Sequence, residues 1–154
     1  MKQINEITFE TVNLVNSLCL FKGEPHCVVN KKAIESAIGN QYQPYETEEL
    51  AYASVYKSLV LNHGFMNGNK RTAVIVLYLF SLISGKELKL NDQEFADLTY
   101  RIAGENGGQI PVEMISSQVF SGQQTSKENR LNDIEKQSIE FIKKHQWLMK
   151  ELGK

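Results

Sequence analysis

The segment that decides the fold is HGFMNGNKRTAVIVLYLFSLIS, residues 63–84. A short loop rich in glycine and asparagine opens it, and the part from Asn69 to Ser84 is apolar on nearly every side. Such a helix is expected at the centre of an α-bundle. The apolar run is shorter than the roughly 20 residues that span a membrane. Gly85 follows in the position that commonly ends a helix. We therefore predict a buried central helix over 69–84.

Apolar residues at three- and four-residue spacing predict further helices on both sides of the central one. They cover residues 8–21, 30–39, 47–62, 91–102 and 111–119. Asn30 and Thr47 can cap two of these helices, and Asn91 with Glu94 resembles a capping box. The short stretch 26–29 looks extended and predicts a small β flap. The expected fold is all-α: a compact helical bundle with a central buried helix, a short β flap and an appended C-terminal helix.

Composition narrows the class of protein. The chain has 154 residues, which is typical of one domain with a core of its own. Seventeen basic and eighteen acidic residues give a net charge of −1, which argues against direct nucleic-acid binding. The first residues lack the apolar core of a signal peptide. Cys19 and Cys27 form no CxxC pattern, so we expect reduced, structural thiols in a cytoplasmic protein that does not enter a membrane.

The C-terminal part differs in composition from the rest. Residues 121–130 are almost wholly polar and predict a linker between a domain over 1–120 and a helix over 131–154. Within that helix an apolar, heptad-like stripe runs from Leu131 to Leu152. The stripe either packs back on the domain or forms a homodimer or partner-binding surface.

The loop before the central helix combines residues that favour a bound phosphate. Lys70 and Arg71 lie in the first turn of the helix, where each cation opposes the macrodipole by about 0.3–1 kcal/mol. Free backbone N–H groups and two cations together favour an anion. His63 ends the preceding helix and can transfer a proton. Each residue also has an ordinary interpretation: the histidine can cap carbonyl groups, and the two cations can be solvated. The joint arrangement of histidine, loop and cations indicates phosphoryl or nucleotidyl transfer.

The loop resembles the signature of the Fic/Doc superfamily. Residues 63–73 read H-x-F-x-N-G-N-K-R-T-A, and the Doc (death-on-curing) toxin branch reads H-x-F-x-D-[A/G]-N-K-R-T-A. The segments IESA (34–37) and FSLISG (80–85) resemble two further parts of the family. The resemblance covers about residues 8–120.

This resemblance implies a compact α-bundle and a role for each loop residue. His63 would be the general base that deprotonates a target hydroxyl, and Phe65 would be the structural anchor of the loop. Gly68 would let the backbone approach a phosphate closely. Asn69, Lys70 and Arg71 would hold phosphate oxygens of ATP.

Two departures from the Fic pattern bear on activity. Lys70 replaces the second Fic glycine and Val74 the final Fic arginine, which matches Doc kinases acting on elongation factor Tu rather than nucleotidyltransferases. Asn67 replaces the acidic residue that positions Mg²⁺ in both branches. A neutral amide is a weaker ligand for this hard cation.

The expected function is therefore a Doc-like toxin that transfers phosphate from ATP, with Mg²⁺, to a serine or threonine hydroxyl of the translation machinery. The chain lacks the inhibitory motif [S/T]-x-x-x-E-[G/N] of many Fic proteins, so restraint by an antitoxin in trans is favoured. Two alternatives stay open. One is a Fic-type protein adenylyltransferase, and the other is a degenerate nucleotide-binding or interaction module.

Overall fold

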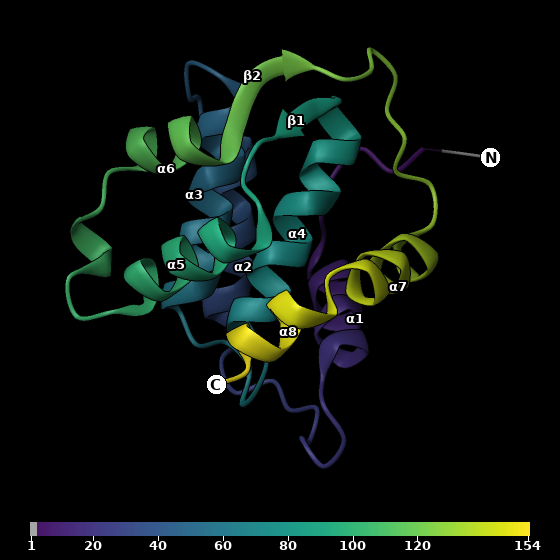
Figure 1. Cartoon of the computed structure of the whole chain (residues 1–154), viewed down its shortest axis with the longest axis vertical. Helices are drawn as coiled ribbons and strands as arrows, with labels where there is room; N and C mark the ends of the chain where they lie inside the picture. The colour runs from purple at the N-terminus through teal and green to yellow at the C-terminus, as the bar shows by residue number, and fades with distance from the viewer. Residues whose placement is uncertain (1–2) are drawn as a thin grey trace.

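Helix α4 (Asn69–Ser84) lies at the centre of a helical bundle (Figure 1). The computed structural model describes residues 3–154. From Ala73 to Leu77 each side chain of α4 is fully buried, which confirms the predicted central helix. The elements that precede α4 are α1 (Phe9–Cys19), α2 (Lys31–Gly39), the 3-10 turn η1 (Asn40–Tyr42) and α3 (Glu48–Leu61). Those that follow are β1 (Lys86–Leu88), α5 (Asp92–Ala103), η2 (Gly107–Gln109), α6 (Val112–Val119), β2 (Phe120–Gln124), α7 (Ile134–Lys144) and α8 (Gln146–Leu152).

The predicted helix caps are present. The Asn30 side chain accepts a hydrogen bond from the Ala33 amide at 3.0 Å, and Thr47 caps α3 in the same way. Asn91 and Glu94 form a reciprocal capping box at the start of α5. Each cap satisfies an amide that has no acceptor inside its own helix, so these local polar residues fix where the helices begin.

Two small β elements join distant parts of the chain. Val28, in the stretch expected to form a flap, makes an isolated antiparallel bridge with Phe65. A two-stranded antiparallel sheet pairs β1 with β2, in the register Lys86 with Gln124 and Leu88 with Phe120. Only the first of these elements was expected from the sequence.

The prediction of a linker over 121–130 is wrong for its first part, because residues 120–124 form β2. The backbone also returns to the end of α4. The Thr125 amide donates to the Gly85 carbonyl at 2.7 Å, and the Arg130 amide donates to the Leu82 carbonyl at 2.9 Å. Exposed polar side chains suggested a free segment, whereas backbone hydrogen bonds hold it in place.

The C-terminal stripe begins at Leu131, before α7, and continues over two helices instead of the one that was predicted. Helix α7 ends at Lys144, His145 has φ −118° and ψ 43°, and α8 begins at Gln146. Figure 1 shows α7 beside α1 and α8 beside α5, and these pairs are in contact. The stripe residues Leu131, Phe141, Leu148 and Leu152 are buried within the chain. Packing on the domain, the first of the two alternatives, is therefore confirmed.

The apolar helices are too short to cross a bilayer. Within residues 3–154, the structure has no helix long and apolar enough to span a membrane. Cys19 is buried, Cys27 is half-buried and both thiols are free.

Candidate functional site

The loop between α3 and α4 carries the residues that the sequence singled out. Helix α3 ends at Leu61, and His63 then adopts a positive φ of 47°, which is uncommon for a residue with a side chain. Gly68 precedes α4 with φ 78°. A Cβ at Gly68 would lie 3.1 Å from the side-chain nitrogen of Asn16. Both the backbone conformation and the limited space therefore favour glycine at this position. The two left-handed turns reverse the chain within a few residues.

Hydrogen bonds to neighbouring segments fix the shape of the loop. Phe65 is 3% exposed and bridges Val28, and the next amide, of Met66, donates to the Cys27 carbonyl at 2.9 Å. Asn69 closes the loop from the other side. Its side-chain nitrogen donates to the Phe65 carbonyl at 2.8 Å, and its side-chain oxygen accepts from the Phe65 amide at 3.0 Å. Because one hydrogen of the Asn69 side-chain nitrogen is used in this way, its second hydrogen and its backbone N–H remain as donors for a phosphate.

Asn67 is half-buried and hydrogen-bonded to two neighbouring segments. Its backbone carbonyl accepts a hydrogen bond of 2.8 Å from the fully buried Asn16, and its side-chain nitrogen donates to the Pro25 carbonyl at 3.3 Å. The second hydrogen of the Asn16 amide reaches the Thr72 hydroxyl at 3.1 Å. Asn16 therefore ties α1 to the loop and to the first turn of α4.

The structure places Arg71 inside the protein, contrary to the expectation of a free phosphate ligand. Its side chain is 2% exposed, and it donates to the Cys19 carbonyl at 2.5 Å and to the Glu24 carboxylate at 2.9 Å. The guanidinium carbon also lies 3.9 Å from the centroid of the Phe21 ring. The hydrogen bond from Arg71 holds the pKa of Glu24 below its usual value of 4.5. A phosphate could reach this guanidinium only by displacing Glu24.

Lys70 and His63 have the freedom that Arg71 lacks. His63 is exposed. Lys70 is half-buried, and its ammonium nitrogen lies 5.4 Å from the centroid of the Tyr100 ring. Both line one cavity of about 240 Å³ together with Gly68. The first N–H groups of α4 lie at this end of the helix and have no acceptor inside the helix. A proton acceptor, a cation and a helix amino end therefore share one cavity.

The rest of the cavity wall comes from distant parts of the chain. Asn67, Asn69 and Arg71 line it, as do Glu24 and the C-terminal residues 152–154. Phe65 anchors the loop from behind and does not line it. The buried Nε of Arg71 has no hydrogen-bond partner within residues 3–154.

Two aromatic rings connect the cavity to the C-terminus. Tyr100 lies beneath Lys70, and its hydroxyl donates to the backbone carbonyls of Glu151 and Lys154. Phe21, which lies against Arg71, is packed so closely by Gly153 that a Cβ there would fall 2.3 Å from the ring. The rings that contact the two loop cations thus also hold the end of the chain.

The residues of the cavity fit a dedicated magnesium site poorly. Glu24 is the one aspartate or glutamate among the described residues that line it, and this carboxylate is paired with Arg71. No cluster of three or more histidine, cysteine, aspartate or glutamate residues within 3–154 could hold a metal ion. Magnesium in proteins is usually held by one or two carboxylates and by substrate phosphates. The amide of Asn67 does not supply such a charge.

Sequence reasoning missed Glu24, Phe21 and Tyr100. Glu24 lies in the segment 22–25, where glycine and proline indicate only a turn after the first helix. Glu24 lies 47 positions before Arg71, and no spacing rule connects the two. The unusual charge of Arg71 at a helix start was the one available signal that it had an acidic partner.

Comparison with protein-family models, with curated proteins and with solved structures finds no match to this chain.

Proposed function

We propose that the protein transfers a phosphate group from ATP to a serine or threonine hydroxyl of another protein. One observation carries the proposal: His63, Lys70 and the amino end of α4 surround a single cavity. An anion in that cavity would meet backbone N–H groups and an ammonium group. A hydroxyl that enters beside it would meet an imidazole. The likeness of residues 63–73 to the Doc signature supports the same chemistry.

In the proposed reaction the imidazole of His63 takes the proton of the target hydroxyl. The hydroxyl oxygen then forms a bond to the γ-phosphorus, and the bond between that phosphorus and the β–γ bridging oxygen breaks, so that ADP leaves. Lys70 and the N–H groups of α4 neutralise the charge on the phosphate oxygens. Phosphoryl transfer gains mainly from such positioning and charge neutralisation. Any Mg²⁺ would depend largely on the nucleotide for its ligands, since the cavity offers one paired carboxylate.

The biological setting of the proposal follows the Doc resemblance. The protein would be a cytoplasmic toxin, its target a protein of the translation machinery such as elongation factor Tu, and its inhibitor an antitoxin supplied in trans.

A second candidate is a nucleotide-binding or interaction module without catalysis. It is favoured by two observations at the cavity: Arg71 is occupied by Glu24, and Asn67 stands where the family has an acidic residue. In this case His63 and Lys70 would hold a phosphate group without transferring it.

Incubation of the full chain with a cell extract and ATP labelled separately at the α- and γ-phosphates tests both candidates. Transfer of the γ label to protein supports the phosphotransferase, and transfer of the α label alone supports an adenylyltransferase instead. If neither label is transferred, thermal unfolding with and without ATP decides: stabilisation supports the module, and no stabilisation contradicts both candidates.

A further inference from the structure

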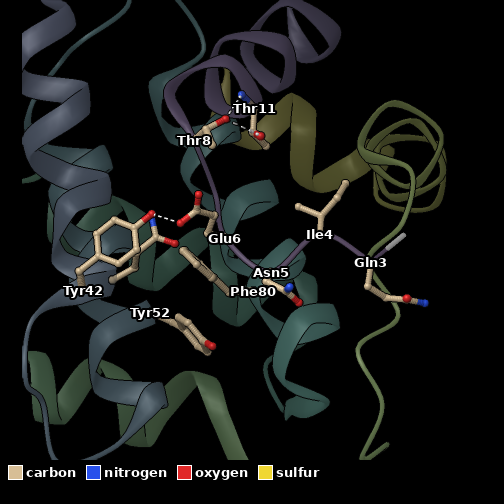
Figure 2. A pocket seen from close by; sticks show the side chains of 10 residues that line it. Gln3, Ile4, Asn5, Glu6, Thr8, Thr11, Tyr42, Tyr52 and Phe80 are labelled. Atoms are coloured by element: carbon tan, nitrogen blue, oxygen red, sulfur yellow. Dashed lines mark hydrogen bonds between the residues drawn. The ribbon is translucent and has the colours of Figure 1, made fainter. Parts of the chain in front are cut away.

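A second cavity, of about 740 Å³, lies near the carboxyl end of α4 and shares no lining residue with the loop cavity. Figure 2 shows it between the extended segment 3–8 on one side and Tyr42 and Tyr52 on the other. Its volume falls in the range of roughly 300–1,000 Å³ that is common for small-molecule sites. We refer to it as the N-terminal cleft.

Aromatic rings form one wall of the N-terminal cleft. The rings of Tyr52 and Phe80 are stacked, with centroids 4.3 Å apart and planes 16° from parallel. Phe80 is 1% exposed and fixed within α4, and Tyr52 is 9% exposed on α3. Tyr42 is 63% exposed and stands at the rim. Because the rings of Tyr52 and Phe80 are almost wholly buried, packing holds them in place, and Tyr42 presents the exposed ring of this wall.

The opposite wall is also held in place. The Gln41 side chain makes two hydrogen bonds to the backbone of Ile7, accepting from its amide at 3.1 Å and donating to its carbonyl at 2.7 Å. Thr8 caps α1, and its hydroxyl oxygen lies 3.1 Å from that of Thr11. These hydrogen bonds therefore hold the segment 3–8 in place opposite the aromatic rings.

The described residues that line the N-terminal cleft carry a negative charge. Glu6 is the single charged side chain among the described residues that line it, and its carboxylate accepts a hydrogen bond from the Tyr42 hydroxyl. This bond raises the pKa of Tyr42 to about 12. Glu48, which does not line the cleft, accepts a hydrogen bond from the Tyr52 hydroxyl at 3.1 Å. Within residues 3–154, neither Glu6 nor Glu48 forms an ion pair.

We propose that the N-terminal cleft binds an organic cation, namely a guanidinium or ammonium group carried on an aliphatic stem. Cations bind to the faces of aromatic rings, and a carboxylate at the rim adds a charge-assisted hydrogen bond. The charged group would lie against the exposed ring of Tyr42 beside the carboxylate of Glu6, with the apolar stem in the cleft next to them. An anionic ligand would meet no basic side chain among the described residues of the lining.

The test measures binding of the short peptide acetyl-Gly-Arg-Gly-amide to the ¹⁵N-labelled full chain by NMR. We expect saturable shifts of the amide signals of residues 5–8, 42 and 52, and none at 63–71. The matched peptide with citrulline, which has the same shape but no charge, should bind at least about tenfold more weakly. Equal binding of the two peptides, or shifts confined to other parts of the chain, would overturn the proposal.

Two variants locate the binding group. Glu6→Gln keeps the size of an exposed side chain and should weaken the arginine peptide roughly tenfold or more. Asn5→Lys adds a positive charge at the same wall and should weaken it independently. Glu105→Gln removes an exposed carboxylate from the turn after α5 and should bind as the parent does. Parental affinity in both cleft variants would contradict the assignment.

Acetyl-arginine amide distinguishes the two sources of such a cation. Binding as strong as that of the peptide indicates a free small molecule or an isolated side chain as the minimal ligand. Weaker binding at the same residues indicates an arginine within a peptide segment, with contacts from its flanking backbone.

Discussion

At the scale of single residues, His63 offers the most direct test of the proposed chemistry. Its side chain is exposed, so His63→Ala should leave the melting temperature unchanged. Loss of a general base should lower the rate of γ-phosphate transfer by about 10²–10⁴-fold. The control is His26→Ala, since His26 is exposed on the neighbouring segment and does not line the cavity. A parental rate in His63→Ala would show that another group takes the proton.

Lys70 and Arg71 should differ sharply in their contributions to stability. Arg71→Ala removes a buried side chain and three contacts, to Cys19, Glu24 and Phe21. Because Glu24 keeps partial access to water, we expect a loss of about 2–4 kcal/mol in the free energy of unfolding. Lys70→Ala should change it by less than about 1 kcal/mol. Urea unfolding of the two variants measures the difference, and equal effects would contradict the structural role of Arg71.

The ion pair between Glu24 and Arg71 should also make stability depend on pH. The pKa of Glu24 is lowered in the folded state, so its contribution is complete above pH 4.5 and is lost as the pH falls through the lower folded value. The urea midpoint of the parent should therefore exceed that of Glu24→Gln near neutral pH. The gap should narrow below pH 4.5. A gap that stays constant down to strongly acid pH would mean that the carboxylate does not act through its charge.

The sequence could not separate Lys70 from Arg71, and the reason is geometric. Adjacent residues of a helix point roughly 100° apart, so one of the pair faces the cavity while the other faces Cys19 and Phe21. Which of them turns inward depends on a partner, Glu24, that is far away along the chain. The position of His63 close to a helix end could be predicted from the local pattern alone, although α3 ends two residues earlier, at Leu61.

At the scale of elements, the end of α4 depends on Gly85. This residue has φ 72°, and a Cβ on it would lie 1.8 Å from the Ser126 carbonyl oxygen. Gly85→Ala should therefore destabilise the protein by about 1–3 kcal/mol or more, through strain and displacement of the chain after β2. Gly39→Ala is the control, since that glycine is helical and has open space around it. Urea unfolding should show it unchanged or up to about 1 kcal/mol more stable.

Elements with local signals were predicted well, and those that depend on distant partners were not. The caps at Asn30, Thr47 and Asn91 act within three residues, so their positions could be read directly from the sequence. The pairing of Lys86 with Gln124 joins two short polar strands that carry no alternating pattern. The apolar stripe continues past His145 without a gap, so it gives no sign of the helix break at this residue. The imidazole of His145 lies 2.8 Å from the Asp92 carboxylate on α5.

At the scale of the whole molecule, the C-terminal helices join the core to the loop cavity. Leu148 and Leu152 are buried, and residues 152–154 line the cavity beside Lys70. The apolar stripe made the burial of these helices predictable. The position of these helices beside the loop could not be predicted. It depends on contacts of Tyr100 and Phe21 with the C-terminal residues, and these contacts leave no pattern in the sequence.

This arrangement predicts that the chain unfolds in one cooperative step. Trp147 is the single tryptophan, is 45% exposed and lies in α8, so its fluorescence reports on the C-terminal helices, whereas far-UV circular dichroism reports on the whole bundle. If α7 and α8 are part of the core, the two signals should give the same urea midpoint. Leu148→Ala should lower both midpoints together, by about 2–4 kcal/mol in the free energy of unfolding, because its side chain is fully buried. Ile139→Ala supplies the comparison, since Ile139 lies on the half-buried outer part of α7 and should cost less. A fluorescence transition well before the circular dichroism transition would instead show that α7 and α8 unfold separately from the bundle.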